Sequence, residues 1–139
     1  MASFPFELVS PERLVVSEEA DEVTVPGIEG EFTVLAGHAP FITVLRPGIV
    51  TARSGSNARR YYVRGGFAEV NPTGLTILAD LALPVEELND ARFATEIAAA
   101  EHAISLAHDD ESRAKAQQQL AWIKDLQALV VPHHVHASH

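Results

Sequence analysis

Residues 22–34 read EVTVPGIEGEFTV, and this stretch decides the fold class. Val23 and Val25 alternate with polar residues, and the same pattern resumes at Phe32 and Val34 after a break that contains two glycines. An alternation with a period of two places successive side chains on opposite faces of a strand, and glycines between two such runs favour a turn. The stretch therefore predicts two strands of an antiparallel β-structure, each with one face turned inward.

The same alternation recurs along the first 84 residues. Phe4, Phe6 and Leu8 alternate in the first run, and further runs that are separated by turn-forming residues lie at 49–53, 60–64, 67–70 and 75–79. Many short alternating runs with regular turn signals are typical of an antiparallel sandwich or barrel. We therefore expect about eight to ten strands, arranged as an all-β antiparallel sandwich over residues 1–84.

Two pairs of turn residues stand out within this region. Pro47-Gly48 predicts a type II turn between two strands, because proline fixes φ at the first central residue and glycine tolerates the positive φ of the second. Gly65-Gly66 predicts a bulge or a tight bend. Arg59, Arg60 and Arg64, which surround two tyrosines, are expected on a solvated strand face, with a salt-bridged protein contact as the alternative.

After Pro84 the hydrophobic period changes from two to about 3.6 residues. One stripe falls on Phe93, Ile97, Ala100, Ile104 and Ala107, and a second falls on Ala116, Leu120, Ile123, Leu126 and Val130. His108-Asp109-Asp110-Glu111 offers an N-cap and an acidic first turn for the second helix, where the helix dipole favours negative charge. Residues 85–131 are therefore predicted to form an antiparallel α-helical hairpin, which makes the chain α+β overall.

Pro132 is expected to end the second helix, because proline lacks the backbone N–H and its ring clashes with the preceding turn. The remaining residues, 132–139, have no apolar pattern, and we expect a disordered tail. Its histidines are His133, His134, His136 and His139. Imidazoles suit transition metals, but a solvated tail without a functional metal site is the prediction.

Composition excludes several classes of function. The chain has 10 Lys and Arg against 19 Asp and Glu, a net charge of -9, which would repel phosphate backbones, so nucleic acid is not an expected partner. It has no cysteine, which excludes disulfides, thiolate metal sites and cysteine nucleophiles. No apolar run reaches the ~18 to 20 residues of a membrane span, and the first residues lack the pattern of a secretory signal, so we expect the protein to stay in the cytoplasm.

No stretch carries a catalytic signature. There is neither a Gly-X-X-X-X-Gly-Lys-Ser/Thr phosphate loop nor a Gly-X-Ser-X-Gly elbow. We therefore expect no catalytic residue and no enzyme activity in this chain.

Several ordered motifs resemble the epsilon subunits of bacterial F-type ATP synthases. They are GEFTVLAGHAPF at 30–41, LRPG at 45–48, GGFAEV at 65–70 and LTILAD at 75–80. The resemblance covers roughly residues 4–130. It implies a non-catalytic subunit of the central stalk of a rotary, proton-translocating synthase, with catalysis on partner subunits and a peripheral position on the cytoplasmic face of the bacterial inner membrane.

The resemblance also implies partners. The sandwich would pack against the gamma subunit and the ring of c subunits, with Glu31 and His38 as contact residues at the c ring. The hairpin would regulate ATP hydrolysis by extending towards the alpha and beta subunits, and Arg113, Lys115 and Lys124 are the candidate inhibitory contacts. From the residues alone, His38 could also be a base, a metal ligand or a plain loop residue, and Glu31 a solvated turn carboxylate.

Some members of the family bind ATP through a Leu- or Ile-Asp-X-X-Arg-Ala motif at the first helix. The matching stretch here is LNDARF at 88–93, in which Asn89 replaces the aspartate and Phe93 replaces the alanine. Asp90 and Arg92 are the candidate nucleotide contacts, and their alternative role is to decorate the first turn of a helix. We expect no cofactor.

Two other classes of function remain open at the level of sequence. The chain could be a ligand-binding β-sandwich of lectin or cupin type with a helical extension, or an adaptor whose hairpin joins a helical bundle. Copurification separates these readings, because only the epsilon-subunit reading requires gamma and the c ring.

Overall fold

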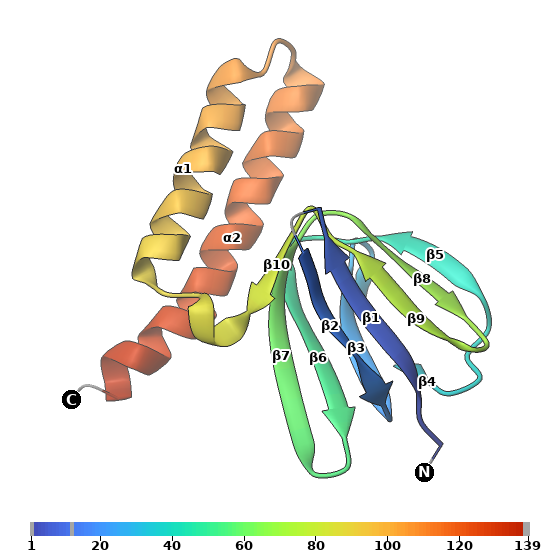
Figure 1. Cartoon of the computed structure of the whole chain (residues 1–139). Helices are drawn as coiled ribbons and strands as arrows, with labels where there is room; N and C mark the ends of the chain where they lie inside the picture. The colour runs from blue at the N-terminus through green and yellow to red at the C-terminus, as the bar shows by residue number, and fades with distance from the viewer. Residues whose placement is uncertain (1, 12, 138–139) are drawn as a thin grey trace. The chain divides into compact units, whose positions relative to one another are not determined.

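The computed structural model describes the backbone of residues 2–11 and 13–137 and the side chains of residues 2–11 and 15–129. The chain separates into two compact units, Met1–Val85 and Glu86–His139. Figure 1 shows strands in the first unit and helices in the second. The predicted order, a β-sandwich followed by a helical hairpin, is confirmed.

Within the described residues the first unit contains ten strands, in agreement with the prediction. They are β1 (Phe4–Ser10), β2 (Arg13–Ala20), β3 (Glu22–Gly27), β4 (Gly30–Leu35), β5 (Phe41–Val44), β6 (Gly48–Ser54), β7 (Asn57–Arg64), β8 (Phe67–Asn71), β9 (Gly74–Leu78) and β10 (Leu81–Pro84). Sheet A has the strand order β2-β1-β9-β8-β5, and sheet B has the order β10-β7-β6-β3-β4 (Figure 1).

One pairing among the described strands is parallel. Strand β1 lies parallel to β9, with a register that runs from Phe6↔Leu75 to Val9↔Leu78. A parallel neighbour needs a long crossover connection, and the seven strands between β1 and β9 supply it. The predicted sandwich of eight to ten strands is confirmed, and the β1–β9 pair adds one parallel pairing to sheet A.

The core lies between the two sheets and consists of the alternate side chains that the sequence pattern assigned to the inner faces. Phe6 and Leu8 of β1 and Val23 and Val25 of β3 are fully buried. Truncation of a fully buried phenylalanine to alanine typically costs about 3 to 5 kcal/mol. Each of these strands is therefore held in place by several kcal/mol of side-chain packing.

The turn predicted at Pro47-Gly48 is corrected by the structure. Gly48 is the first residue of β6 and does not have the positive φ that a type II turn requires. Glycine is needed at this position for a different reason: a Cβ at Gly48 would lie 2.7 Å from the Cβ of Pro26. The glycine allows the backbones of β3 and β6 to pack closely.

The bend predicted at Gly65-Gly66 is confirmed. Both glycines have positive φ, 67° and 93°, between β7 and β8. A Cβ at Gly66 would lie 2.0 Å from the carbonyl oxygen of Leu78. A larger residue is therefore excluded by both conformation and space.

The second unit contains a short 3₁₀ turn (Val85–Glu87) and two helices, α1 (Asp90–Leu106) and α2 (Asp110–Ala137). Phe93 and Ala100 of the first predicted stripe and Ile123 and Leu126 of the second are buried. Glu96 of α1, which lies outside the predicted stripe, is buried as well. The side chain of Val130 lies outside the described residues.

Side chains cap both helices. The Asn89 side-chain oxygen accepts a hydrogen bond of 2.9 Å from the Arg92 N–H at the start of α1. Asp109 Oδ1 accepts one of 2.7 Å from the Ser112 N–H at the start of α2. The N-cap predicted between His108 and Glu111 is therefore Asp109.

Helix α2 continues through Pro132 to Ala137, so the predicted helix end at Pro132 is corrected. Proline's fixed φ of about −65° is itself helical, and the ring removes one N–H from the ladder at a cost of about 3 kcal/mol. The side chains of His133, His134 and His136, and residues 138–139, lie outside the described residues. Among the described helices, none combines the length and the apolar character that crossing a membrane requires.

Candidate partner-binding surfaces

The loop between β4 and β5 holds His38 by contacts with its own neighbours. The His38 N–H donates to the Leu35 carbonyl at 3.2 Å, and Nδ1 lies 2.9 Å from the Ala39 carbonyl oxygen. The imidazole ring lies 5.3 Å from the Phe41 ring, which makes an edge contact with Phe32 at 5.1 Å. His38 therefore closes a chain of three rings at the end of the sandwich.

Chemistry at His38 would need further groups. Among the described residues no three His, Cys, Asp or Glu side chains gather as a metal site would require. A general base would need a partner that orients the ring, and the nitrogen that is engaged here faces a backbone carbonyl. The geometry fits a contact residue in a shaped loop.

Glu31 lies at the other end of β4 from His38. It is the second residue of β4, it pairs with Pro26 beside the β3–β4 turn, and it is exposed. His38 follows the other end of that strand, and the span from Glu31 to Leu35 alone is about 13 Å. The structure does not bring the two predicted contact residues together.

The outer face of sheet A carries an exposed row of apolar side chains. The register places Val44 of β5 beside Phe67 of β8, Phe67 beside Leu78 of β9, and Leu78 beside Val9 of β1. Val44, Phe67 and Leu78 are 54%, 39% and 41% exposed. We call these four residues the apolar row, and Ile42, 65% exposed, lies beside it on β5.

Sequence reasoning missed the apolar row, although a signal for it was present. The strands of a sheet with one face in water alternate apolar and polar residues. Strand β5 (FITV) and the end of β9 (TIL) break this alternation, because they have apolar residues on both faces. Ile42, Val44 and Leu78 are apolar at positions of the outward phase. Excess apolar residues at that phase indicate a face that a partner covers.

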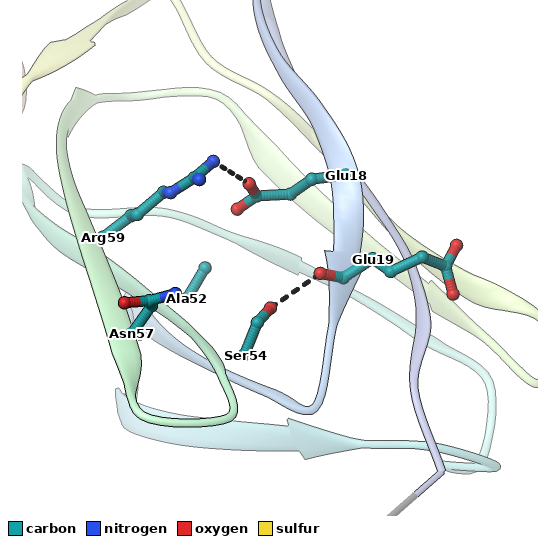
Figure 2. Close-up of a pocket in the computed structure, with 6 residues that line it drawn as sticks. All are labelled: Glu18, Glu19, Ala52, Ser54, Asn57 and Arg59. Atoms are coloured by element: carbon teal, nitrogen blue, oxygen red, sulfur yellow. Dashed lines mark hydrogen bonds and ion pairs between the residues drawn. The ribbon is translucent and has the colours of Figure 1, made fainter.

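A depression of about 270 Å³ lies on the sandwich, lined by the residues drawn in Figure 2, which are Glu18, Glu19, Ala52, Ser54, Asn57 and Arg59. Arg59 forms an ion pair with Glu18, and Ser54 Oγ donates a hydrogen bond of 2.7 Å to the Glu19 carbonyl (Figure 2). These contacts tie β2 of sheet A to β6 and β7 of sheet B. The charged groups are already engaged within the protein, so the depression closes an edge of the sandwich and is not a ligand site.

The three predicted inhibitory residues are exposed on α2. Arg113 lies 3.5 Å from Asp110 in an ion pair one turn apart. Arg113 and Lys124 are eleven residues apart, which places them within about 20° of one another around the helix, whereas Lys115 lies about 200° from Arg113. The helix therefore gathers two of the three cations on one face.

The nucleotide motif is used structurally. The Asn89 oxygen is occupied by the cap, and Phe93 is buried. Asp90 is exposed in the first turn, and the Nε of Arg92 is buried without a hydrogen-bond partner among the described residues. One guanidinium nitrogen without a hydrogen-bond partner among the described residues does not by itself make a phosphate site, and the absence of nucleotide binding stays a prediction.

Comparisons with known proteins place this architecture in a family. Residues 3–85 match the family model "ATP synthase, Delta/Epsilon chain, beta-sandwich domain". An ATP synthase epsilon chain from Mesorhizobium japonicum is 45% identical over 131 residues, which are 94% of this chain and 97% of the relative. An epsilon chain from Bradyrhizobium sp. (strain BTAi1) is 54% identical over 101 residues, 73% of this chain and 75% of the relative.

Two solved structures of ATP synthases contain chains similar to this one. A chain of the Euglena gracilis mitochondrial ATP synthase matches with a TM-score of 0.72 and 27% identity over 94% of this chain and 82% of that one. A chain of the Tetrahymena thermophila mitochondrial ATP synthase central stalk and c-ring structure, with 13% identity, a TM-score of 0.65 and coverage of 89% and 96%, shares the fold. The sandwich, the capped hairpin and these relatives together show that the chain belongs to the ATP synthase epsilon-chain family.

Proposed function

We propose that this chain is a non-catalytic subunit of the central stalk of a proton-translocating ATP synthase, where it couples the catalytic sector to the c ring. Family membership supports this role, since the curated relatives are ATP synthase epsilon chains. The Euglena relative comes from an assembly described as OSCP, F1 and c-ring. The observation that carries the proposal is the apolar row on sheet A.

The apolar row is the surface we assign to the gamma subunit. Val44, Phe67 and Leu78 are large, exposed and adjacent on three neighbouring strands. Contiguous exposed apolar patches with polar surroundings mark protein–protein contacts. The rigid, close-packed core behind the row suits a part that transmits torque, because packed interiors deform little under load.

The loops at the two ends of β4 are assigned to the c ring. Glu31 and His38 are accessible there, and His38 is held in shape by Phe41. Through these contacts the subunit lies at the cytoplasmic face of the bacterial inner membrane as a peripheral component of the complex.

The hairpin is assigned a regulatory role. Arg113 and Lys124 on one face of α2 supply positive charge that an acidic segment of the alpha or beta subunits would attract. Lys115 points to another side and contributes less to one contact. In this role the hairpin restrains ATP hydrolysis without carrying any chemistry of its own.

A matched pair of leucine variants tests the gamma contact. Leu78→Ser removes an apolar side chain from the row, whereas Leu35→Ser removes one of similar exposure, 55%, from β4 of sheet B. Loss of an interface leucine costs about 1 to 3 kcal/mol, so we expect Leu78→Ser to bind roughly tenfold to hundredfold more weakly. Binding is measured to an assembly of alpha, beta and gamma subunits that lacks this chain.

The control variant should bind with the affinity of the unmodified protein. Thermal unfolding of both variants checks that neither has lost its fold. Equal affinities for the two variants and the unmodified chain would contradict the assignment of the apolar row to gamma.

A further inference from the structure

A second row of residues runs beside the apolar row on the outer face of sheet A. The register places Glu69 of β8 beside Thr76 of β9, and Thr76 beside Glu7 of β1. We call these three residues the acidic row. Each lies two residues from a member of the apolar row along its own strand, so the two rows are about 7 Å apart.

The two carboxylates of the acidic row are not balanced by nearby cations. Strands β1, β5, β8 and β9 contain no Lys, Arg or His. Glu7 and Glu69 are exposed, and within the part of the chain whose side chains are described neither forms an ion pair or a hydrogen bond. Among the side chains that the structure describes, Glu7 and Glu69 on this face therefore have no paired cation; the side chain of Arg13, at the start of the remaining strand β2, lies outside them.

Sheet B differs in this respect. Its strands β6 and β7 carry Arg53 and Arg60, and Arg53 is paired in register with Glu22 across β6 and β3. The carboxylate Glu22 therefore has a cation as its cross-strand neighbour. Glu7 and Glu69 of sheet A have no such cross-strand cation.

A partner that covers the apolar row comes within reach of both carboxylates. Strands are about 4.8 Å apart, and Glu7 and Glu69 are separated by β9, so the two charges are about 10 Å apart. A purely apolar partner surface would remove hydrating water from these carboxylates and offer no hydrogen bond or charge in its place, which is unfavourable. A complementary surface supplies positive charge at both places.

We infer that the surface of the partner that docks on sheet A carries an apolar strip and, beside it, two Lys or Arg side chains about 10 Å apart that face Glu7 and Glu69. This inference rests on the proposed function, in which the partner is the gamma subunit. The charge pair steers the encounter and fixes the orientation of the sandwich, while the apolar row holds the complex together. Charges at an interface rim act mainly on the association rate and its salt dependence.

The test compares charge-neutralising variants of the full chain. Glu7→Gln and Glu69→Gln are combined in one variant, and Glu22→Gln on sheet B is the matched control. Association and dissociation rates are measured with the assembly of alpha, beta and gamma subunits, at low and high salt. Glutamine has nearly the shape of glutamate, and thermal unfolding checks that the variants are folded.

We expect the double variant to associate about tenfold more slowly at low salt and to match the unmodified chain at high salt, where charges are screened. Its dissociation rate should change little, and Glu22→Gln should behave as the unmodified chain. An unchanged association rate with unchanged salt dependence would overturn the inference. Faster association would overturn it as well, because it would indicate an acidic partner surface.

The variant Leu78→Ser separates this inference from the proposed function. If Leu78→Ser binds more weakly while the association rate of the double variant is unchanged, the charge pair is contradicted and the gamma contact is supported. Unchanged binding of Leu78→Ser overturns both the charge pair and the assignment of the apolar row to gamma.

Discussion

His38 is fixed by its immediate neighbours and not by a distant functional group. Its Nδ1 faces the Ala39 carbonyl and its ring faces Phe41. A catalytic histidine is normally oriented by a carboxylate and positioned against a substrate. The shape of the loop is therefore the property of His38 that function can use.

We expect His38→Ala to leave the maximal rate of ATP hydrolysis within about twofold in an assembly freed from the membrane sector. Loss of a general acid or base would lower that rate by about 10² to 10⁴-fold, and His38 is expected to play no such role. Retention of the c ring should weaken, since the ring contact with Phe41 shapes the loop. His102→Ala, at an exposed position of α1, is the control. A loss of orders of magnitude in the detached assembly would show a catalytic role instead.

At the scale of elements, α2 begins on a charged cap. Hydrogen bonds from the backbone N–H of Ser112, and then from its hydroxyl, hold the pKa of Asp109 below its ordinary value of 3.8. A carboxyl with a lowered pKa in the folded state stabilises the fold above its ordinary pKa and loses that contribution as the pH falls below it. The start of α2 is therefore sensitive to acid.

Two variants separate the charge from the hydrogen bond. Asp109→Asn keeps a capping oxygen without the charge, and Asp109→Ala removes both. Near neutral pH the unmodified chain should unfold at a higher temperature than Asp109→Asn, and this difference should shrink as the pH falls below 3.8 and through the lowered pKa of Asp109. Asp109→Ala should remain less stable at both pH values. A difference between the unmodified chain and Asp109→Asn that persists in acid would contradict this account.

The elements themselves could be predicted from the sequence because their causes are local. The alternation of Phe4, Phe6 and Leu8 is enough to define a strand face, and Asp109 is enough to mark a helix start. The relations between elements were missed, since alternation shows which face is buried but not which strand lies beside it. The parallel β1–β9 pair, the packing of Gly48 on Pro26 and the apolar row all depend on neighbours that are distant in sequence.

At the scale of the whole molecule, the two units differ in what holds them together. The sandwich has a continuous core between two sheets, whereas the alanine-rich α1 buries little apolar area at each position. Isolated helices are marginal in water. The sandwich is therefore expected to fold without the hairpin, and the hairpin to depend on contacts with other surfaces.

Truncation after Pro84 tests the regulatory role. We expect ATP hydrolysis by the reconstituted complex to rise less than about tenfold and the rise to shrink at high salt, because exposed charge pairs contribute about 0.2 to 1 kcal/mol each. Three such charges fall short of the ~5.5 kcal/mol that would move a population from 1:99 to 99:1. Cooperative unfolding of the truncated chain shows that the sandwich is intact. A larger rise in the hydrolysis rate that salt does not affect would indicate that apolar contacts hold the inhibited state.

The parallel pairing of β1 with β9 also bears on how the protein is made. Strand β1 is synthesised before the other strands of the first unit, yet one of its two neighbours in sheet A ends at Leu78. Its pairing therefore has a high contact order, and such long-range pairings form slowly because a large loop must close first. Until residue 78 has been synthesised, one edge of β1 stays open and can pair with other nascent chains. Completion of the first unit through Leu78 is therefore the step that covers this edge of β1.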